Sequence, residues 1–407
     1  MLIVRHYAFS FCIKLETLSI NLNRLNHLME LFRVTKEDLL GKLNEKRKKL
    51  LVEKDVFISE MPASLLKKID AIFNKGLAYY LDPKDPVKSS DESIFFRKDD
   101  FNAVLSLGAK QIVNKFEEDK LSFAALSKLI DFPIKRTVPV YKISDNPVAV
   151  ASEVRGYLYP VFDNNKRTFL SNFIASLAEY NILVFEFVEA HNKKERANIN
   201  GFFLSPNVIV LKRNQKSFRR EIFTLAHELG HYLLNAEDID DNLSDNFFVN
   251  NKSNGNNIED WCNNFAFAFL VGSYGKELDE LSKATASNDY HHSIIDAIAQ
   301  STHLSTLALY TRLLINGRLS PVDYTAIADN IMEEFKKSEL AKKEALEKAK
   351  KKALDEGKTL IIPAPKPIIS PLYLQTLQGA LYSGLINEQD FCKRLHIPAD
   401  KLDSYLV

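Results

Sequence analysis

Apolar residues in the first part of the chain recur every three or four positions, which is the spacing of helices that bury one face. The pattern runs over residues 21–81 and restarts several times. Thr35 and Asp38 form a weak capping box, a third helix is predicted over residues 45–57, and Pro62 suits the start of a fourth. Four or five short helices in about 60 residues predict a small helical bundle, one form of which is a helix-turn-helix domain.

β-branched and aromatic residues form three short runs in the middle of the chain, which is typical of strands. The runs cover residues 181–189, 199–204 and 207–212, and only Ser205 and Pro206 separate the last two. This short separation predicts a tight hairpin within a small antiparallel sheet. A helical pattern begins directly after the hairpin and lasts for about five turns.

The chain beyond residue 272 is again helical in pattern, with two helices predicted around a short turn at residues 302–305. Residues 333–358 mix nine lysines with seven acidic residues around Ala and Leu. Because the two signs are interspersed, this stretch predicts a solvated, salt-bridged helix rather than an arm that binds nucleic acid. A proline-rich linker at residues 361–371 then leads into a last helical module.

These patterns together predict an α+β protein that is mainly helical and is built from several domains, as its length of 407 residues suggests. A stretch rich in proline and acidic residues at 82–93 marks the first boundary. The predicted segments are 1–90, a helical bundle; 91–140, a helical connector; 141–275, a domain with the sheet; 276–332, a helical, helix-turn-helix-like segment; 333–370, the charged helix and linker; and 371–407, the C-terminal helical module.

Composition mainly excludes classes of function. The formal net charge is +1, so the chain as a whole has no attraction for nucleic acid or for an anionic membrane. No uncharged apolar run approaches the roughly 20 residues that span a bilayer. The three cysteines, Cys12, Cys262 and Cys392, are far apart and odd in number, which favours a reducing cytoplasm and offers no cysteine cluster to a metal. The oligomeric state stays unknown from sequence.

The helix after the hairpin carries the clearest chemistry, in the sequence FTLAHELGH at residues 223–231. Ser217 is a fair N-cap, and the apolar residues along the segment predict burial. His227 and His231 are four positions apart, so both imidazoles lie on one side of a helix and can bind one metal ion. Glu228 lies at the edge of that side, where its carboxylate can act as a general base without being a ligand.

A catalytic zinc site needs a third protein ligand and an open position. The segment NNIEDWCNNFAFAFLVG predicts a second helix, on which Glu259 is the best candidate for that ligand and Asp260 the next. The alternative is a core helix whose two histidines are merely buried and hydrogen-bonded. The preceding strands, the buried-helix pattern and the carboxylate on a second helix together favour the metal site.

Further polar residues are candidates for other roles. Tyr232 and His291 are the nearest in sequence that would stabilise charge in a transition state, against the alternatives that Tyr232 packs in the core and His291 faces solvent at a helix start. The N-terminal bundle has one basic cluster that would contact DNA, against the alternative of a bundle that packs or binds a protein partner. The members of this cluster are Lys46, Arg47, Lys48 and Lys49.

At FTLAHELGHYLLN and IEDWCNNFAFAFL the sequence resembles the ImmA/IrrE family of zinc-dependent metallopeptidases, which pairs HExxH with an E-x-x-(A/C)-N-x-F-A helix. The resemblance implies a zincin-like peptidase core at residues 141–275. It implies Zn²⁺ on His227, His231 and Glu259, with Glu228 as the catalytic glutamate.

The resemblance covers most of the chain and is strongest over residues 199–272. GLAYYLDP and SIFFRK resemble the junction in family members that carry an N-terminal XRE-type helix-turn-helix, which implies a degenerate module of that type here. LSTLALYTRLLINGRLSPVDY resembles their downstream helical segment. One departure is Gly272, which stands where the helix of the family usually ends in a proline.

The resemblance implies a metallo-endopeptidase of narrow specificity that cleaves a regulatory protein. The implied partner is a helix-turn-helix repressor or the product of a neighbouring gene, in a stress, mobile-element or toxin-antitoxin-like setting. The alternative is a non-enzymatic transcriptional regulator or partner-binding protein with a structural or vestigial zinc site. The intact Glu228 favours the enzyme, because a structural site has no need of a base.

Overall fold

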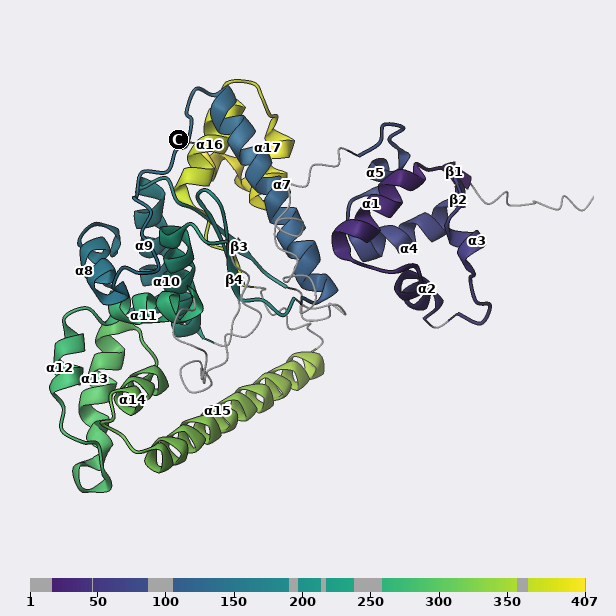
Figure 1. Cartoon of the computed structure of the whole chain (residues 1–407). Coiled ribbons are helices and arrows are strands. Elements are labelled where there is room, and N and C mark those ends of the chain that lie inside the picture. Colours follow the sequence, from purple (N-terminus) through teal and green to yellow (C-terminus); the bar gives the residue numbers. More distant parts are fainter. Residues whose placement is uncertain are drawn as a thin grey trace, which may run out of the picture. The chain divides into compact units, whose positions relative to one another are not determined.

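A computed structural model describes residues 17–45, 47–86, 105–189, 197–213, 217–237, 258–356 and 365–406. Contacts between residues divide the chain into two compact units, Met1–Lys115 and Phe116–Val407, and each is described by itself. Figure 1 shows the elements of both. The finer division into six segments stays a prediction.

The first unit is a bundle of short helices with a two-stranded antiparallel sheet. The predicted capping box is confirmed, because the Asp38 N–H donates to Thr35 Oγ1 at 3.1 Å and the Thr35 N–H donates to Asp38 Oδ2 at 3.2 Å. The elements of this unit are β1 (Thr17–Ser19), α1 (Leu22–Phe32), α2 (Lys36–Asn44), α3 (Glu53–Val56), β2 (Glu60–Pro62), α4 (Ala63–Phe73) and α5 (Leu77–Leu81).

The helix predicted over residues 45–57 is wrong for most of its length. α2 ends at Asn44, whose side chain accepts from the Leu51 N–H at 2.7 Å and donates to the Leu51 carbonyl at 3.0 Å. These two bonds close a loop. Within the rest of the predicted range, only the single turn of α3 is helical. Like charges one turn apart in KRKK also disfavour a helix there.

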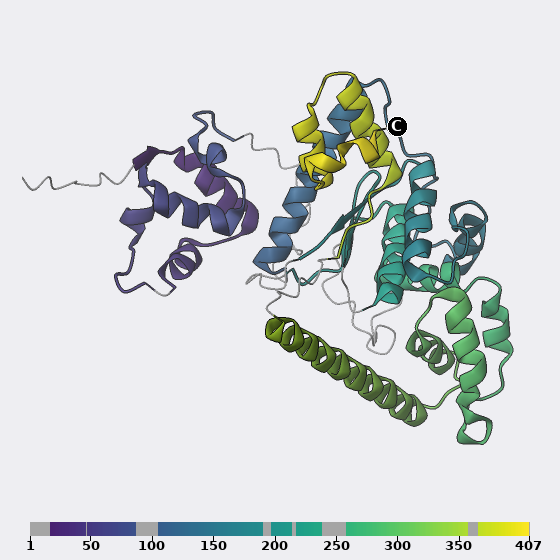
Figure 2. The same ribbon diagram turned by 180° about the vertical axis from the view of Figure 1, so that it is seen from behind.

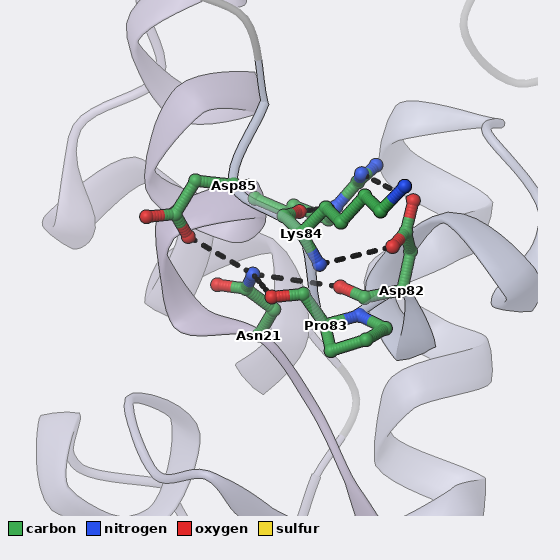
Figure 3. A network of polar contacts seen from close by, with 6 residues as sticks. Asn21, Asp82, Pro83, Lys84 and Asp85 are labelled. Carbon is green, nitrogen blue, oxygen red and sulfur yellow. Dashed lines mark hydrogen bonds and ion pairs between the residues drawn. The ribbon is translucent and has the colours of Figure 1, made fainter.

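Polar contacts join the start of α1 to the segment that follows α5 (Figure 3). Asn21 caps α1 with its side-chain oxygen and donates from Nδ2 to Asp85 Oδ1 at 3.1 Å. Arg24 donates from Nε to the Lys84 carbonyl at 2.7 Å, and its Nη2 pairs with Asp82 Oδ2 at 2.5 Å. The segment after α5 is therefore held against the first helix of the bundle.

The second unit contains a three-stranded sheet in the order β3-β5-β4, made of β3 (Leu183–Phe187), β4 (Gly201–Leu204) and β5 (Val208–Lys212). The predicted hairpin is confirmed, because β4 and β5 are adjacent and antiparallel. β3 runs parallel to β5, so the sheet is mixed and the expectation of a purely antiparallel sheet is wrong. No turn joins β3 to β5, so the local sequence does not set the direction of β3. The mainly helical α+β class is confirmed.

Helices surround this sheet and continue to the C-terminus. The predicted pair around residues 302–305 is confirmed as α13 and α14, and the C-terminal module is helical as predicted. The helices are α7 (Leu107–Leu129), which spans the division between the units, α8 (Pro147–Leu158), α9 (Lys166–Glu179), α10 (Phe218–Leu234), α11 (Ile258–Val271), α12 (Tyr274–Glu280), α13 (His292–Thr302), α14 (Thr306–Ile315), α15 (Pro321–Asp355), α16 (Pro371–Tyr382) and α17 (Glu388–Leu395), with 3-10 turns η2 (Ala286–His291) and η3 (Ala399–Tyr405).

Both faces of the sheet are buried, which explains why its strands read as continuous apolar runs. Val184 and Ile209, on one face, belong to the core that α9 and α10 share. On the other face the ring centroid of Phe185 lies 5.3 Å from that of Phe116 in α7 and 5.0 Å from that of Tyr373 in α16. The sheet is thus sandwiched between two helical layers, and α10 lies against the same face as α9.

The charged helix α15 is solvated, as its sequence predicted. Tyr324 and Ile327 are its buried residues, and both lie in its first two turns. Figures 1 and 2 show this helix as a long rod and show α16 and α17 beside α7. None of the helices in the described ranges is long and apolar enough to cross a membrane.

Candidate active site

The helix that carries the two histidines, α10, is enclosed by its neighbours. Its N-cap is Ser217, as predicted, with Ser217 Oγ accepting from the Arg220 N–H at 3.3 Å. His227, Glu228 and His231 are all no more than 1% exposed. Burying ionisable side chains of this kind is costly unless each is paired or binds a metal. We therefore expect His227, Glu228 and His231 to be paired with other groups or to lie at a metal site.

α11 approaches α10 closely because Gly230 has no side chain. A Cβ at Gly230 would lie 3.1 Å from Cys262 Sγ and equally close to the Cys262 backbone. A neighbouring side of α11 carries Trp261 and Phe265, whose rings stack with centroids 5.5 Å apart. This packing fixes the rotation of α11, and Glu259 thereby comes to lie beside the histidines of α10.

Three potential metal ligands meet where the two helices touch. His227 Nε2 lies 3.1 Å from His231 Nε2, and the two carboxylate oxygens of Glu259 lie 3.2 Å from His227 Nε2 and 3.2 Å from His231 Nε2. In the part of the chain that the structure describes, these are the residues grouped closely enough to hold a metal ion, and Asp260 is not among them. We refer to His227, His231 and Glu259 as the trio.

The spacing of the trio fits a small tetrahedral ion. With bonds of about 2.0 to 2.1 Å to imidazole nitrogen or carboxylate oxygen, two ligands of a tetrahedral zinc lie about 3.3 Å apart. The distances of 3.1 and 3.2 Å within the trio are close to this value. Two histidines and one glutamate are also a ligand set that zinc uses in hydrolytic enzymes, with the fourth position left open.

The charge of Glu259 is favoured by its neighbours. Burial by itself would raise the pKa of this carboxyl, but hydrogen bonds and charge from His227 and His231 outweigh burial and hold the pKa below its ordinary value. Glu259 is thus a carboxylate at neutral pH, which is the form that binds a cation.

Asn263, the asparagine of the E-x-x-(A/C)-N-x-F-A pattern, also lies at this junction, although it was not among the predicted site residues. His227 Nδ1 and Asn263 Oδ1 are 2.9 Å apart, and Asn263 is 3% exposed. The residue is four positions after Glu259, so both side chains lie on one face of α11. This spacing is the feature of the sequence from which a role for Asn263 at the site could have been predicted.

Glu228 lies against the edge strand β4. A Cβ added at Gly201 would be 2.9 Å from Glu228 Oε1 and 2.8 Å from Thr224 Cγ2. The carboxylate therefore occupies the space that a side chain at Gly201 would fill. β4 bonds to β5 on one side, and no strand of the described ranges bonds to its other side.

The remaining predicted site residues lie elsewhere. Tyr232 is fully buried, with Arg136 stacked over its ring at 3.8 Å. His291, in η2, bonds through Nε2 to Ser282 at 3.2 Å. None of the contacts described here joins Tyr232 or His291 to the trio, and their role as transition-state helpers stays a prediction.

The basic cluster of the first unit lies in the loop between α2 and α3. Lys48 and Lys49 are exposed, Arg47 is half-buried, and Lys46 lies outside the described residues. α3, the short helix after this loop, consists of four residues, two of them the acids Glu53 and Asp55. A contact of this cluster with DNA stays a prediction.

The end of α11 shows what replaces the proline usual in the resembling family. Gly272 has a φ of +55°, a left-handed conformation that glycine adopts at little cost. The Arg155 guanidinium donates to the Phe269 carbonyl in the last turn and would collide with any Cβ at Gly272. The change affects how the helix stops and leaves the trio untouched.

A comparison with family models places most of this site within one known domain. Residues 178–314 match the IrrE N-terminal-like domain (Peptidase_M78). The matched segment includes β3 to β5, α10 and α11, and ends in α14. No curated protein and no solved structure matches the chain. The match supports the resemblance to the ImmA/IrrE family and indicates a metallopeptidase, with a metal that is usually zinc.

Proposed function

We propose that this protein is a zinc-dependent endopeptidase that cleaves one or a few regulatory proteins in the cytoplasm. The observation that carries the proposal is the trio, in which two imidazole nitrogens and a carboxylate face one another at 3.1 to 3.2 Å. A structural site would be complete with four protein ligands, whereas the described residues offer three, with the buried Glu228 beside them.

His227, His231 and Glu259 would hold the zinc ion. Zinc in such a site lowers the pKa of water and polarises a carbonyl group, which prepares both partners of a hydrolysis. The chain itself supplies the proton transfers. Glu228 takes the proton of the attacking water and then passes it to the amine that leaves.

The substrate is proposed to bind along the edge of β4 that pairs with no strand of the described ranges. An extended peptide can add to a free strand edge through main-chain hydrogen bonds, which holds it in one register. Because Gly201 of β4 lies against Glu228, a peptide on this edge would pass close to the base. The same arrangement favours an unfolded or extended cleavage segment over a compact one.

The substrate class comes from the resemblance, which implies a helix-turn-helix repressor or the product of a neighbouring gene. Cys262 and Cys392 are buried and form no disulfide within the described residues, which agrees with a reducing compartment. A narrow specificity follows from the regulatory role, because cleavage of many proteins would not act as a switch.

The test is to incubate the purified, zinc-loaded chain with candidate repressors encoded near it and to identify fragments by mass spectrometry. We expect a single cleavage by the wild type and none by Glu228→Gln at equal zinc content. If both proteins relieve repression equally and no fragment forms, the function is regulation without proteolysis, and the proposal is wrong.

A further inference from the structure

The two histidines of the trio have different surroundings. His227 Nδ1 lies 2.9 Å from Asn263 Oδ1, and both side chains are almost fully buried. His231 Nδ1 is also buried, but it has no hydrogen-bond partner within the described ranges. Among the described residues, a side chain therefore hydrogen-bonds to the second ring nitrogen of His227 but not to that of His231.

The contact with Asn263 determines where His227 carries its proton. An amide oxygen only accepts hydrogen bonds, so the His227 Nδ1 must carry the hydrogen in this pair. When the ring is neutral, as a metal ligand must be, its lone pair then lies on Nε2. Nε2 is the atom that lies 3.1 Å from His231 and 3.2 Å from Glu259, which is where a metal ligand is needed.

We infer that Asn263 is a positioning residue, which fixes the tautomer and the ring orientation of His227 before a metal arrives. Hydrogen bonds of this kind to the second nitrogen of a ligand histidine commonly govern metal affinity. Asn263 acts through His227 and does not touch substrate. This inference rests on the proposed metal site and not on the proteolytic activity.

An asparagine at position 263 affects the charge of the site differently from an aspartate. A carboxylate at this position would also accept from Nδ1–H, but it would add negative charge and make the imidazole a stronger donor. A neutral amide orients the ring without adding to the charge of Glu259. A metal bound here would therefore be a stronger Lewis acid with Asn263 than with an aspartate at this position.

The first experiment measures zinc affinity of the metal-free, full-length chain by competition with a chromophoric chelator. We expect Asn263→Ala to bind zinc about 10- to 100-fold more weakly than the wild type. Asn263→Asp retains the acceptor and should bind at least as tightly as the wild type. Asn264→Ala is the matched control, because Asn264 lies next in sequence and bonds instead to Arg312 and to the Asp260 carbonyl.

The second experiment reads the tautomer directly, by ¹⁵N NMR of labelled histidine in the metal-free protein. We expect the Nδ1–H form of His227 in the wild type and in Asn263→Asp, and a mixture of both tautomers in Asn263→Ala. This readout would not change if Asn263 only filled space. Should the alanine variant fail to fold, Asn263→Leu gives the same readout, because it keeps a side chain of similar size and removes the acceptor.

Zinc bound equally by the wild type and a folded Asn263→Ala, or an Nε2–H tautomer in the wild type, would overturn the role of Asn263. Failure of the wild type to bind zinc at all would instead refute the metal site, and with it the proposed function. The two failures are therefore distinguishable.

Discussion

Two groups of largely buried charged side chains in the described part of the second unit differ in kind. One is the trio of His227, His231 and Glu259. The other, which we call the arginine cluster, consists of Glu186 in β3, Arg213 after β5 and Glu221 in α10. Arg213 Nη1 pairs with Glu221, its Nε lies 3.9 Å from Glu186 Oε2, and the same Glu186 oxygen accepts from the Ile368 N–H at 2.5 Å.

The arginine cluster carries its own cation, because the guanidinium is always charged and has no lone pair to offer a metal. The trio itself contains no lysine or arginine, and its three groups all offer lone pairs toward a common point. Buried charge therefore does not by itself mark a metal site. The donor atoms distinguish the two groups. The trio can bind a cation, whereas the arginine cluster is a structural network that links β3, α10 and the segment before α16.

The largest effects should come from changing one glutamate of α10 in each region. Glu228→Gln removes the base and should lower the cleavage rate by about 10²- to 10⁴-fold, with zinc content and melting temperature near those of the wild type. Rates on a cleaved repressor, zinc analysis and thermal unfolding measure the three quantities.

Glu221→Gln is the counterpart in the arginine cluster. It removes the carboxylate nearest to the buried Arg213 guanidinium and leaves only the more distant Glu186 in the arginine cluster, which should lower the free energy of unfolding by about 3 kcal/mol. Zinc content and cleavage should persist below the melting temperature. Loss of cleavage by folded Glu221→Gln would mean that the two regions are not separate in function.

The next effect is a pH dependence that arises in the arginine cluster. Burial is the largest influence on Glu186 and raises its pKa to about 7 from an ordinary 4.5, although the Ile368 N–H and the charges of Arg213 and Arg167 act against it. The charge of Glu221 acts with burial. Between these pH values the folded chain binds more protons than the unfolded chain, so stability falls as pH rises.

Glu186→Gln should remove this dependence. The variant should match the wild type at pH 5 and exceed it at pH 8 by about 3 kcal/mol in free energy of unfolding, since one pKa unit corresponds to about 1.4 kcal/mol. Urea unfolding at both pH values measures the difference. A variant that is less stable than the wild type at pH 8 would show that the ionised carboxylate is needed.

A smaller effect is expected at Gly201, where the sheet meets the base. In Gly201→Ala the new Cβ must displace Glu228 or Thr224, and a shift of the base of about 1 Å can lower the rate by about 10²-fold. Zinc binding should change little. Gly156→Ala is the matched control in α8, because a Cβ there meets open space; an equal loss of rate in both variants would argue against a specific contact.

The smallest effect is expected at Lys48 and Lys49 in the first unit. Both are exposed, so their replacement by alanine should change the free energy of unfolding by no more than about 0.5 kcal/mol. Zinc content and cleavage should not change. A drop in DNA retention, measured by gel shift at defined salt, would support the contact predicted for the basic cluster.

Features governed by neighbouring residues could be predicted from the sequence. The cap at Ser217, the capping box at Thr35 and the helical face shared by His227 and His231 each depend on a few consecutive positions. The turn between α13 and α14 was equally local. These elements form from short-range periodicity and capping chemistry.

Features that depend on distant contacts were missed. The parallel pairing of β3 with β5, the loop closed by Asn44 and Leu51, and the arginine cluster all join residues that have no local pattern in common. Asn263 had a signal, its spacing from Glu259, but only the proximity of α10 gives that spacing a meaning. The residues of the trio could be named from the sequence because HExxH and Glu259 each belong to a helix that the sequence pattern predicts.

The central claim is that the trio holds a metal ion, and zinc analysis of the purified chain tests it most directly. We expect about one zinc ion per chain in the wild type, in Glu228→Gln and in Glu186→Gln, and a marked loss in His227→Ala and Glu259→Ala. Zinc retained at the wild-type level by His227→Ala and Glu259→Ala would contradict the account.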